Sequence, residues 1–200
     1  MSGASAEASN GSRSERPKLV GVLALQGDFE AHAKVLRALV AQPREVRVPA
    51  DLEGLDALII PGGESTVMSL GIERERLTEP LRALAGSGTP VLGTCAGMIM
   101  LDRDHLGILD IATRRNAFGR QVRSFEVDIE VDGVDGGPMH AVFIRAPWVA
   151  EHGPGVDVLG RVEEHPVAIR QGNVLAVSFH PELTGDSRLH QLLLRSGGRR

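Results

Sequence analysis

Three continuous aliphatic runs constrain the fold of this chain more than any other feature of its sequence. They cover residues 19–25, 57–60 and 90–93, and each leads directly into a loop or turn that contains glycine. A strand that is apolar at successive positions is buried on both faces, which is typical of parallel sheets covered by helices. The runs therefore predict the central strands of such a sheet.

The segments between these runs favour helices. Apolar residues recur at helical spacing before Pro43, and a second helical stretch is expected at residues 73–85, with a short strand at 45–48 between them. The recurring apolar residues of the first stretch are Phe29, Ala33, Leu36, Leu39 and Val40. Alternation of strand and helix predicts a parallel sheet with right-handed crossovers.

The second half of the chain has a different pattern. Residues 121–132 alternate between polar and apolar, as in a half-exposed antiparallel strand. Further strands are expected at 141–144, 156–162, 166–170 and 174–179, followed by a closing helix at 187–195. The fold class predicted is α/β: a flavodoxin-like, three-layer arrangement of a mostly parallel central sheet flanked by helices, with an added antiparallel layer.

Residues 18–195 are expected to form a single domain. Residues 1–17 contain no Val, Ile, Leu or aromatic side chain that would offset the entropy of ordering, so they predict a disordered tail. Residues 196–200 are expected to be a flexible end. The tail also lacks the apolar stretch of a secretory signal, which favours a cytoplasmic protein.

Composition excludes several classes of function. Lys plus Arg number 22 against 26 Asp plus Glu, so no clustered basic face for nucleic acid is indicated. The single cysteine, Cys95, excludes an intramolecular disulfide and a thiolate metal cage. The uncharged run 83–101 is long enough to span a membrane, but Gly and Pro at 86–90 interrupt it, so no transmembrane helix is expected.

Cys95 stands between Gly93 and Gly97, after an apolar strand and before an apolar stretch that can begin a helix. A reactive residue at such a strand-to-helix turn is typical of a nucleophile elbow, where unpaired helix N–H groups favour an anion. The alternative is that Cys95 is a small buried apolar residue.

His180-Pro181-Glu182 follows the apolar strand at 174–177. If the segment stays extended, both side chains point to the same side, and a carboxylate beside an imidazole fixes its tautomer, as in a catalytic triad. His165 lies in a similar Glu-Glu-His-Pro segment, but before a strand rather than after one, so His180 is preferred. The other histidines are interpreted as structural: His32, His105, His140, His152 and His190.

The loop 61–66 (Pro-Gly-Gly-Glu-Ser-Thr) also follows a buried strand. Ligands of open α/β sheets bind where parallel strands end, so this loop and Cys95 are expected at one edge. A glycine there lets a backbone N–H reach a substrate oxygen. A phosphate-binding loop is the competing interpretation, although no Lys follows in the required spacing and Glu64 would repel phosphate. The third interpretation of this loop is a plain turn without a binding role.

The elbow together with His180-Pro181-Glu182 resembles the class I, or triad, glutamine amidotransferases. A narrower resemblance, to the glutaminase subunits of pyridoxal 5′-phosphate synthase, rests on five segments in the same order. These are residues 25–27, 61–66, 115–121, 143–147 and 178–184. The connection between Leu101 and Arg115 is shorter here than is usual in that family.

The resemblance implies a role for each matching residue. Cys95 would be the nucleophile, His180 the base and acid, and Glu182 the residue that orients the imidazole. The N–H groups of Gly63 and Ala96 would flank the oxyanion. Glutamine would be held by Gly63, Glu64, Ser65, Arg115, Ile144 and Arg145.

The reaction implied is hydrolysis of glutamine to glutamate and ammonia through a γ-glutamyl thioester. Ammonia would pass to a barrel-type synthase subunit in a hetero-oligomeric complex that makes pyridoxal 5′-phosphate. No cofactor or metal is expected, since pyridoxal 5′-phosphate would be the product. Two alternatives remain: a glutaminase of another pathway or γ-glutamyl hydrolase, and a non-catalytic subunit that only binds the synthase.

Overall fold

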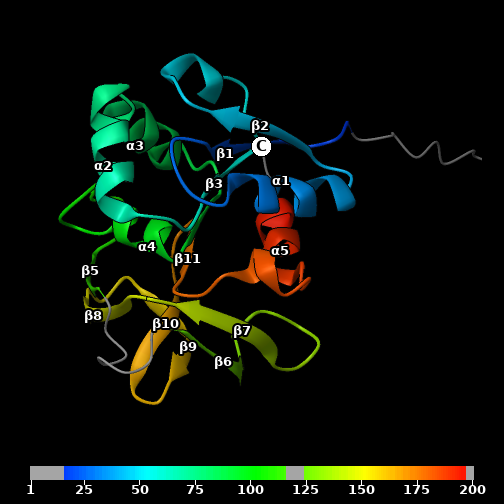
Figure 1. Cartoon of the computed structure of the whole chain (residues 1–200), viewed down its shortest axis with the longest axis vertical. Coiled ribbons are helices and arrows are strands. Elements are labelled where there is room, and N and C mark those ends of the chain that lie inside the picture. The colour runs from blue at the N-terminus through cyan, green and yellow to red at the C-terminus, as the bar shows by residue number, and fades with distance from the viewer. Residues whose placement is uncertain (1–15, 116–123, 197–200) are drawn as a thin grey trace, which may run out of the picture.

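The computed structural model describes residues 16–115 and 124–196, and a seven-stranded sheet is at its centre (Figure 1). The strand order is β2 (Gln42–Val46), β1 (Leu19–Leu23), β3 (Ala57–Ile60), β4 (Val91–Thr94), β11 (Val174–Val177), β10 (His165–Gln171) and β9 (Asp157–Val162). The first five strands of this order run parallel to one another. β10 and β9 extend the sheet with antiparallel pairing.

Helices cover both faces of this sheet. One face packs against α2 (Ser65–Arg74), α3 (Thr78–Gly86), α4 (Ala96–Leu101) and the short 3₁₀ helix η1 (Pro49–Leu52). The other packs against α1 (Phe29–Ala38) and α5 (Arg188–Ser196). Successive residues of β3 enter opposite cores: Leu58 and Ile60 face the first group of helices, and Ile59 faces the second. This explains why the strand is apolar at every position.

Two small antiparallel sheets lie in the lower part of Figure 1, near β10 and β9 of the central sheet. β5 (Ile111–Arg114) pairs with β8 (Trp148–His152), and β6 (Ser124–Ile129) pairs with β7 (Met139–Ile144). Phe143 of β7 stacks on Phe125 at 4.6 Å and contacts Phe179, which follows β11, at 5.6 Å between ring centroids. These rings fix β7 to the end of the central sheet. The predicted fold class is confirmed.

Two predicted elements were wrong in their bounds. The helix expected at 73–85 is α3, which begins five residues later than expected; α2 before it was not predicted, and the two helices are separated at residues 75–77, where Arg76 has φ 57° and Leu77 is buried. The strand expected at 45–48 is β2, which lies earlier in the chain, at Gln42–Val46. β2 is an edge strand, where Pro43 is tolerated although it has no N–H to donate.

Other expectations fall partly or wholly beyond the described residues. β5 and β8 were not predicted, and residues 121–123 of the expected alternating strand lie outside the described part of the chain. So do residues 1–15 and 197–200, which hold most of the two predicted terminal segments. Arg16 is described, and it forms a two-pronged ion pair with Asp56. In the described ranges, no helix is long and apolar enough to cross a membrane.

Candidate active site

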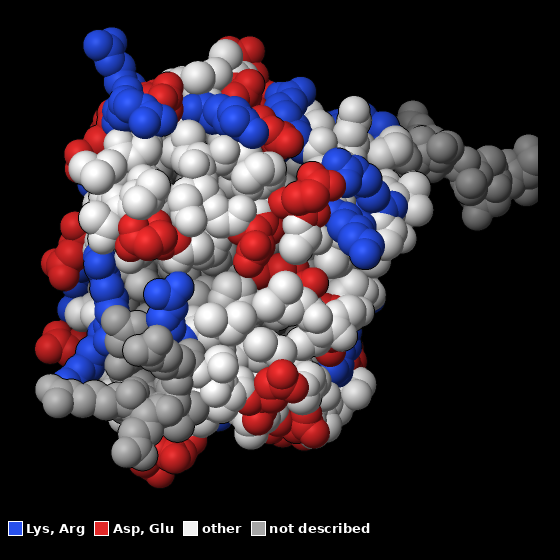
Figure 2. All heavy atoms as spheres, in the orientation of Figure 1, with Lys and Arg blue, Asp and Glu red and all other residues white. Residues whose placement is uncertain are grey.

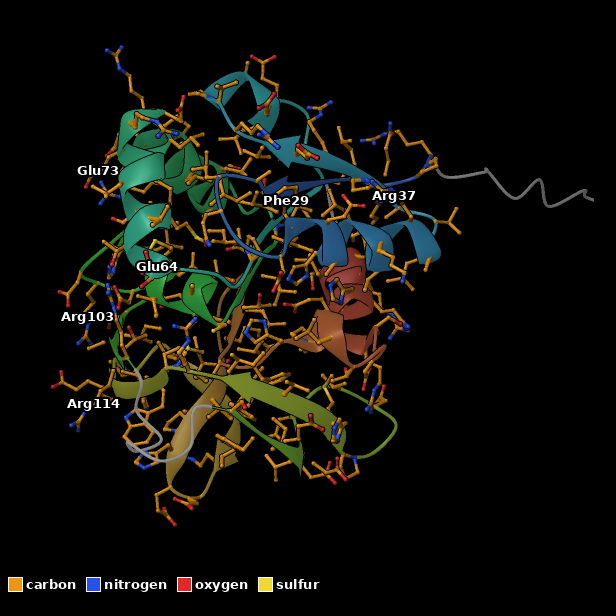
Figure 3. All side chains as sticks on the ribbon, in the orientation of Figure 1. Phe29, Arg37, Glu64, Glu73, Arg103 and Arg114 are labelled. Atoms are coloured by element: carbon orange, nitrogen blue, oxygen red, sulfur yellow. The ribbon has the colours of Figure 1, made fainter. Side chains whose placement is uncertain are left out.

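A cavity of about 400 Å³ opens where β1, β3, β4 and β11 end. Its lining comes from loops that are far apart in the sequence, and Figure 3 shows Glu64 where α2 begins, beside α4. The lining residues are Gln26, Gly27, Asp28, Gly63, Glu64, Ser65, Cys95, Ala96, Ile99, Arg115, Ile144, Arg145 and His180. The carboxyl edge of a parallel sheet is where such folds bind ligands.

Cys95 occupies a strained turn between β4 and α4. Its φ of 48° and ψ of −109° lie in a region that side chains rarely adopt. Its N–H donates to the Val177 carbonyl at 2.8 Å, so β11 holds the turn in place. A Cβ on Gly97 would lie 1.9 Å from the Ile60 carbonyl oxygen, so a glycine at this position lets α4 pack directly on β3. The result is a buried sulfur that still lines the cavity.

His180 and Glu182 are paired, as the sequence predicts, but through a different backbone shape. The Nδ1 atom of His180 lies 2.7 Å from Oε1 of Glu182. The segment is not extended: Pro181 begins the 3₁₀ helix η2 (Pro181–Leu183), and the turn brings the two side chains together. The His180 N–H donates to the Val142 carbonyl, which joins this turn to β7.

The surroundings of His180 favour its charged form. Burial alone would lower its pKa, but hydrogen bonds and charge from Cys95 and Glu182 outweigh burial and raise the pKa of His180 to about 10. Gly62 passes close to this group, because a Cβ there would lie 2.4 Å from Cε1 of His180 and 3.3 Å from Cβ of Cys95. The arrangement suits an imidazolium beside a thiolate, a reactive pair for acyl transfer.

The loop 61–66 ends in a helix, which the sequence interpretation missed. Glu64 is the N-cap of α2, and its carboxylate accepts from the N–H groups of Thr66 and Val67 at 3.1 and 2.8 Å. These bonds, led by that from Val67, lower the pKa of Glu64 below its ordinary value. The Glu64 N–H donates to Oε1 of Gln26 at 2.6 Å. Glu64 is therefore a fixed negative charge at the cavity wall.

Arg115 is held at the cavity by a second group of side chains. Its guanidinium donates to Nε2 of His105 at 3.1 Å, and Nδ1 of His105 lies 2.7 Å from the buried carboxylate of Asp102. Thr113 also donates to Asp102, at 2.6 Å. Arg145 lines the same cavity with φ 46°, a second strained position. The cavity walls thus carry the guanidinium groups of Arg115 and Arg145 and the carboxylates of Glu64 and Asp28.

One group of possible metal ligands is found in the described part of the chain: Asp28, His180 and Glu182, whose ligand atoms lie within 4.8 Å of one another. His180 and Glu182 already share a hydrogen bond at 2.7 Å. A charge-assisted bond of this length is a good account of why the two groups are close.

Comparison with known proteins identifies the family. The sequence profile of the SNO glutamine amidotransferase family matches residues 22–197. Pyridoxal 5′-phosphate synthase subunit PdxT of Frankia alni is 56% identical over 191 residues, which cover 90% of this chain and 96% of that protein. The chain belongs to the SNO glutamine amidotransferase family.

Solved structures agree with this assignment. A crystal structure of a glutamine amidotransferase is 48% identical, with a TM-score of 0.85, and covers 90% of this chain and 99% of that one. The structure of PurLQS from Thermotoga maritima is 19% identical, with a TM-score of 0.70 over 90% of this chain and 97% of that one, and shows the shared fold. The predicted family and fold are therefore both confirmed.

The fold of this amidotransferase brings the predicted site residues together. All of them line the cavity except Glu182, which lies behind His180. His165, at the start of β10, does not line the cavity. Its ring stacks on that of Trp148 in β8, with ring centroids 3.4 Å apart. The sequence prediction missed Gln26, Asp28 and Ile99 as lining residues, although Gln26 belongs to one of the five family segments.

Two buried histidines close to Glu182 were interpreted as ordinary structural residues. Nε2 of His32 lies 3.3 Å from Oε2 of Glu182, and Nδ1 of His32 lies 2.9 Å from Nε2 of His190. A signal for His32 was present in the sequence, since it falls on the apolar face of α1 beside Ala33 and Leu36. A histidine on a buried helical face needs polar partners.

Proposed function

We propose that this chain is the glutaminase subunit of a pyridoxal 5′-phosphate synthase, with Cys95, His180 and Glu182 as its catalytic triad. The observation that carries the proposal is the meeting of a strained Cys95 with the His180–Glu182 pair at a cavity of about 400 Å³. The Frankia alni relative is a pyridoxal 5′-phosphate synthase subunit, which supports this pathway over those of other glutaminases.

The reaction begins at Cys95. The thiolate attacks the side-chain carbonyl carbon of glutamine, and the carbonyl electron pair moves to oxygen. Imidazolium of His180 donates its proton to the leaving nitrogen, so the C–N bond breaks and ammonia departs from a γ-glutamyl thioester. His180, now neutral, takes a proton from water; the hydroxide attacks the thioester, and glutamate and the Cys95 thiolate are released. Glu182 holds the ring and stabilises its charge throughout.

Substrate binding follows from the charges on the cavity walls. Arg145 and Arg115 are suited to the α-carboxylate of glutamine, because a guanidinium pairs with a carboxylate through two parallel N–H donors. Glu64 is suited to the α-ammonium group. Its cap bonds to α2 keep it ionised and in place. Gly63 and Ala96 are the proposed N–H donors to the oxyanion, with Ser65 and Ile144 completing the pocket.

The ammonia goes to a barrel-type synthase subunit, so the working unit is a hetero-oligomeric complex in the cytoplasm. The chemistry requires neither a metal nor a cofactor, since the thiol, imidazole and carboxylate supply the nucleophile, the acid and the base. Figure 2 shows Lys and Arg interspersed with Asp and Glu on the face it presents, without a basic stripe for nucleic acid.

The deciding experiment compares the wild type with Cys95→Ala in the presence of the synthase subunit. We expect glutamate release by the wild type and its loss in the variant, with the melting temperature retained. Because Cys95 is the sole cysteine, a γ-glutamyl adduct trapped at low temperature maps to one site. Equal rates in both proteins would remove Cys95 from the mechanism. Glutamate release without pyridoxal 5′-phosphate formation by any synthase subunit would favour the glutaminase of another pathway.

A further inference from the structure

Four buried side chains form a row of polar contacts behind the cavity, in which Oε2 of Glu182 faces Nε2 of His32 at 3.3 Å but has no hydrogen bond among the described residues. His190 of α5 contacts His32 of α1, His32 contacts Glu182, and Glu182 contacts His180. Figure 1 shows α1 and α5 beside each other on the same face of the sheet. His32 and His190 are fully buried, whereas His180 lines the cavity. The row therefore runs from the interior to the reacting groups.

We propose that His32 is a positioning residue for this amidotransferase, and that His190 fixes the tautomer in which the Nε2 proton of His32 faces Glu182. The inference rests on the proposed function only in taking Cys95 and His180 as the reacting pair. It assigns to two histidines a part in setting the charge state of that pair.

The direction of the row follows from counting protons. A carboxylate can only accept, and Nε2 of His32 is the atom that faces Oε2 of Glu182 at 3.3 Å and the Thr94 hydroxyl at 3.2 Å. A bare Nε2 would set its lone pair against this ionised oxygen, so the single proton of a neutral His32 belongs on Nε2, where the Thr94 hydroxyl oxygen accepts it, and Nδ1 accepts. The partner of Nδ1 is Nε2 of His190, at 2.9 Å, and this atom must therefore donate.

The two atoms without a hydrogen-bond partner agree with this assignment. Nδ1 of His190 and Oε2 of Glu182 are both buried and have no partner among the described residues. If His190 donates through Nε2, its Nδ1 is a bare acceptor, and an unpaired acceptor costs less than an unpaired N–H. Oε2 of Glu182 is also an acceptor, and the Nε2–H of His32 is the dipole that faces it at 3.3 Å. The N–H groups thus have one consistent direction, from His190 through His32 toward Glu182.

Burial keeps both histidines neutral. Burial, then His190 and His180, lowers the pKa of His32 well below its ordinary value. Burial lowers the pKa of His190 to about 4, against a smaller opposite effect of Asp186. A neutral N–H dipole holds the carboxylate in place without cancelling its charge, so Glu182 can still support the imidazolium of His180. Removing His32 takes this dipole away from Oε2 of Glu182, which has no hydrogen bond among the described residues.

The test measures alkylation of Cys95 by iodoacetamide against pH, since this sole thiol reports the thiolate without substrate or partner. His32→Leu removes the donor, and His32→Gln retains an N–H near the place of Nε2. We expect His32→Leu to move the acid limb of the profile upward by about one pH unit at most, because one polar contact of ordinary size to Glu182 is lost. His32→Gln should lie near the wild type. His140→Leu, an exposed histidine on β7, is the matched control and should change nothing.

A double-mutant cycle separates positioning from a general structural effect. In a Glu182→Gln background, His32→Leu should no longer move the acid limb, because its effect passes through that carboxylate. Nitrogen NMR of labelled histidines in the unaltered protein gives the second measurement, independent of how the variants fold. We expect neutral His32 and His190, each protonated on Nε2.

The overturning results are distinct. An unmoved acid limb in folded His32→Leu, an equal shift in His32→Gln, a shift that persists beside Glu182→Gln, or a proton on Nδ1 of His32 would each refute the inference. None of these depends on glutamine hydrolysis. A chain that fails to release glutamate but shows the expected alkylation profiles would refute the proposed function and leave the row standing.

Discussion

Gly62→Ala tests how tightly the reacting pair is packed. A Cβ at this position would lie 2.4 Å from Cε1 of His180, whereas ordinary van der Waals contact begins at 3.4 Å. The ring would have to withdraw by about 1 Å. It cannot do so and keep the bond of 2.7 Å to Glu182. A misplacement of this size costs about 10² in rate. We therefore expect glutamate release to fall about a hundredfold.

The fold should survive the substitution. Gly62 has no positive φ, so alanine adds crowding without backbone strain, and overpacking costs about 1–3 kcal/mol. The matched control is Gly86→Ala, where a Cβ at the end of α3 meets no atom within 4 Å. The assay is glutamate release with the synthase subunit in excess, beside thermal unfolding of both variants. A Gly62→Ala enzyme as fast as Gly86→Ala would refute the claim that ring position limits the reaction.

Two further predictions concern charge. Since the pKa of His180 is raised from 6.5 to about 10, its protonation stabilises the fold fully below pH 6.5 and that contribution is lost as the pH rises toward 10. The difference in unfolding free energy between wild type and His180→Gln should therefore shrink over this range; a constant difference in denaturant titrations would contradict it. His105→Leu should release Arg115 and raise the KM for glutamine about tenfold with little change in kcat, which is the lower end for a hydrogen bond made by a charged group. A change in kcat alone would show that His105 acts elsewhere.

The buried strands could be predicted from sequence because their apolar pattern reflects burial on two faces. Residues 57–60 are strand β3 in the structure, and the runs at 19–25 and 90–93 overlap β1 and β4. α2 was missed because its apolar residues do not form one stripe: Met68 and Ile72 are buried, whereas Val67 and Leu70 are exposed. β5 and β8 owe their structure to pairing across a bulge between distant segments, which no local pattern encodes.

Some residues of the candidate site could likewise be predicted from the sequence, and others could not. Cys95, His180 and the loop at 61–66 stand at the ends of strands, where the sequence marks them by neighbouring glycine and proline. The contact between His180 and Glu182 was expected for an extended chain, yet a 3₁₀ turn makes it. The apolar face of α1 marks His32 as buried, but its role could not be assigned because Glu182 and His190 come from other elements. Asp102 has its partner His105 three residues away, yet its link to the cavity passes through Arg115, which only the structure shows.

The strand order has a consequence for the synthesis of this protein. β4, which Cys95 follows, pairs with β11, and the two strands are separated by about eighty residues of chain. A ribosome that has released β4 has not yet made the strand that accepts the Cys95 N–H, nor His180 beyond it. Long-range parallel pairing of this kind forms late. The growing polypeptide therefore carries its thiol without the imidazole that activates it while these residues are made, and reactivity begins only when the last strand closes the sheet.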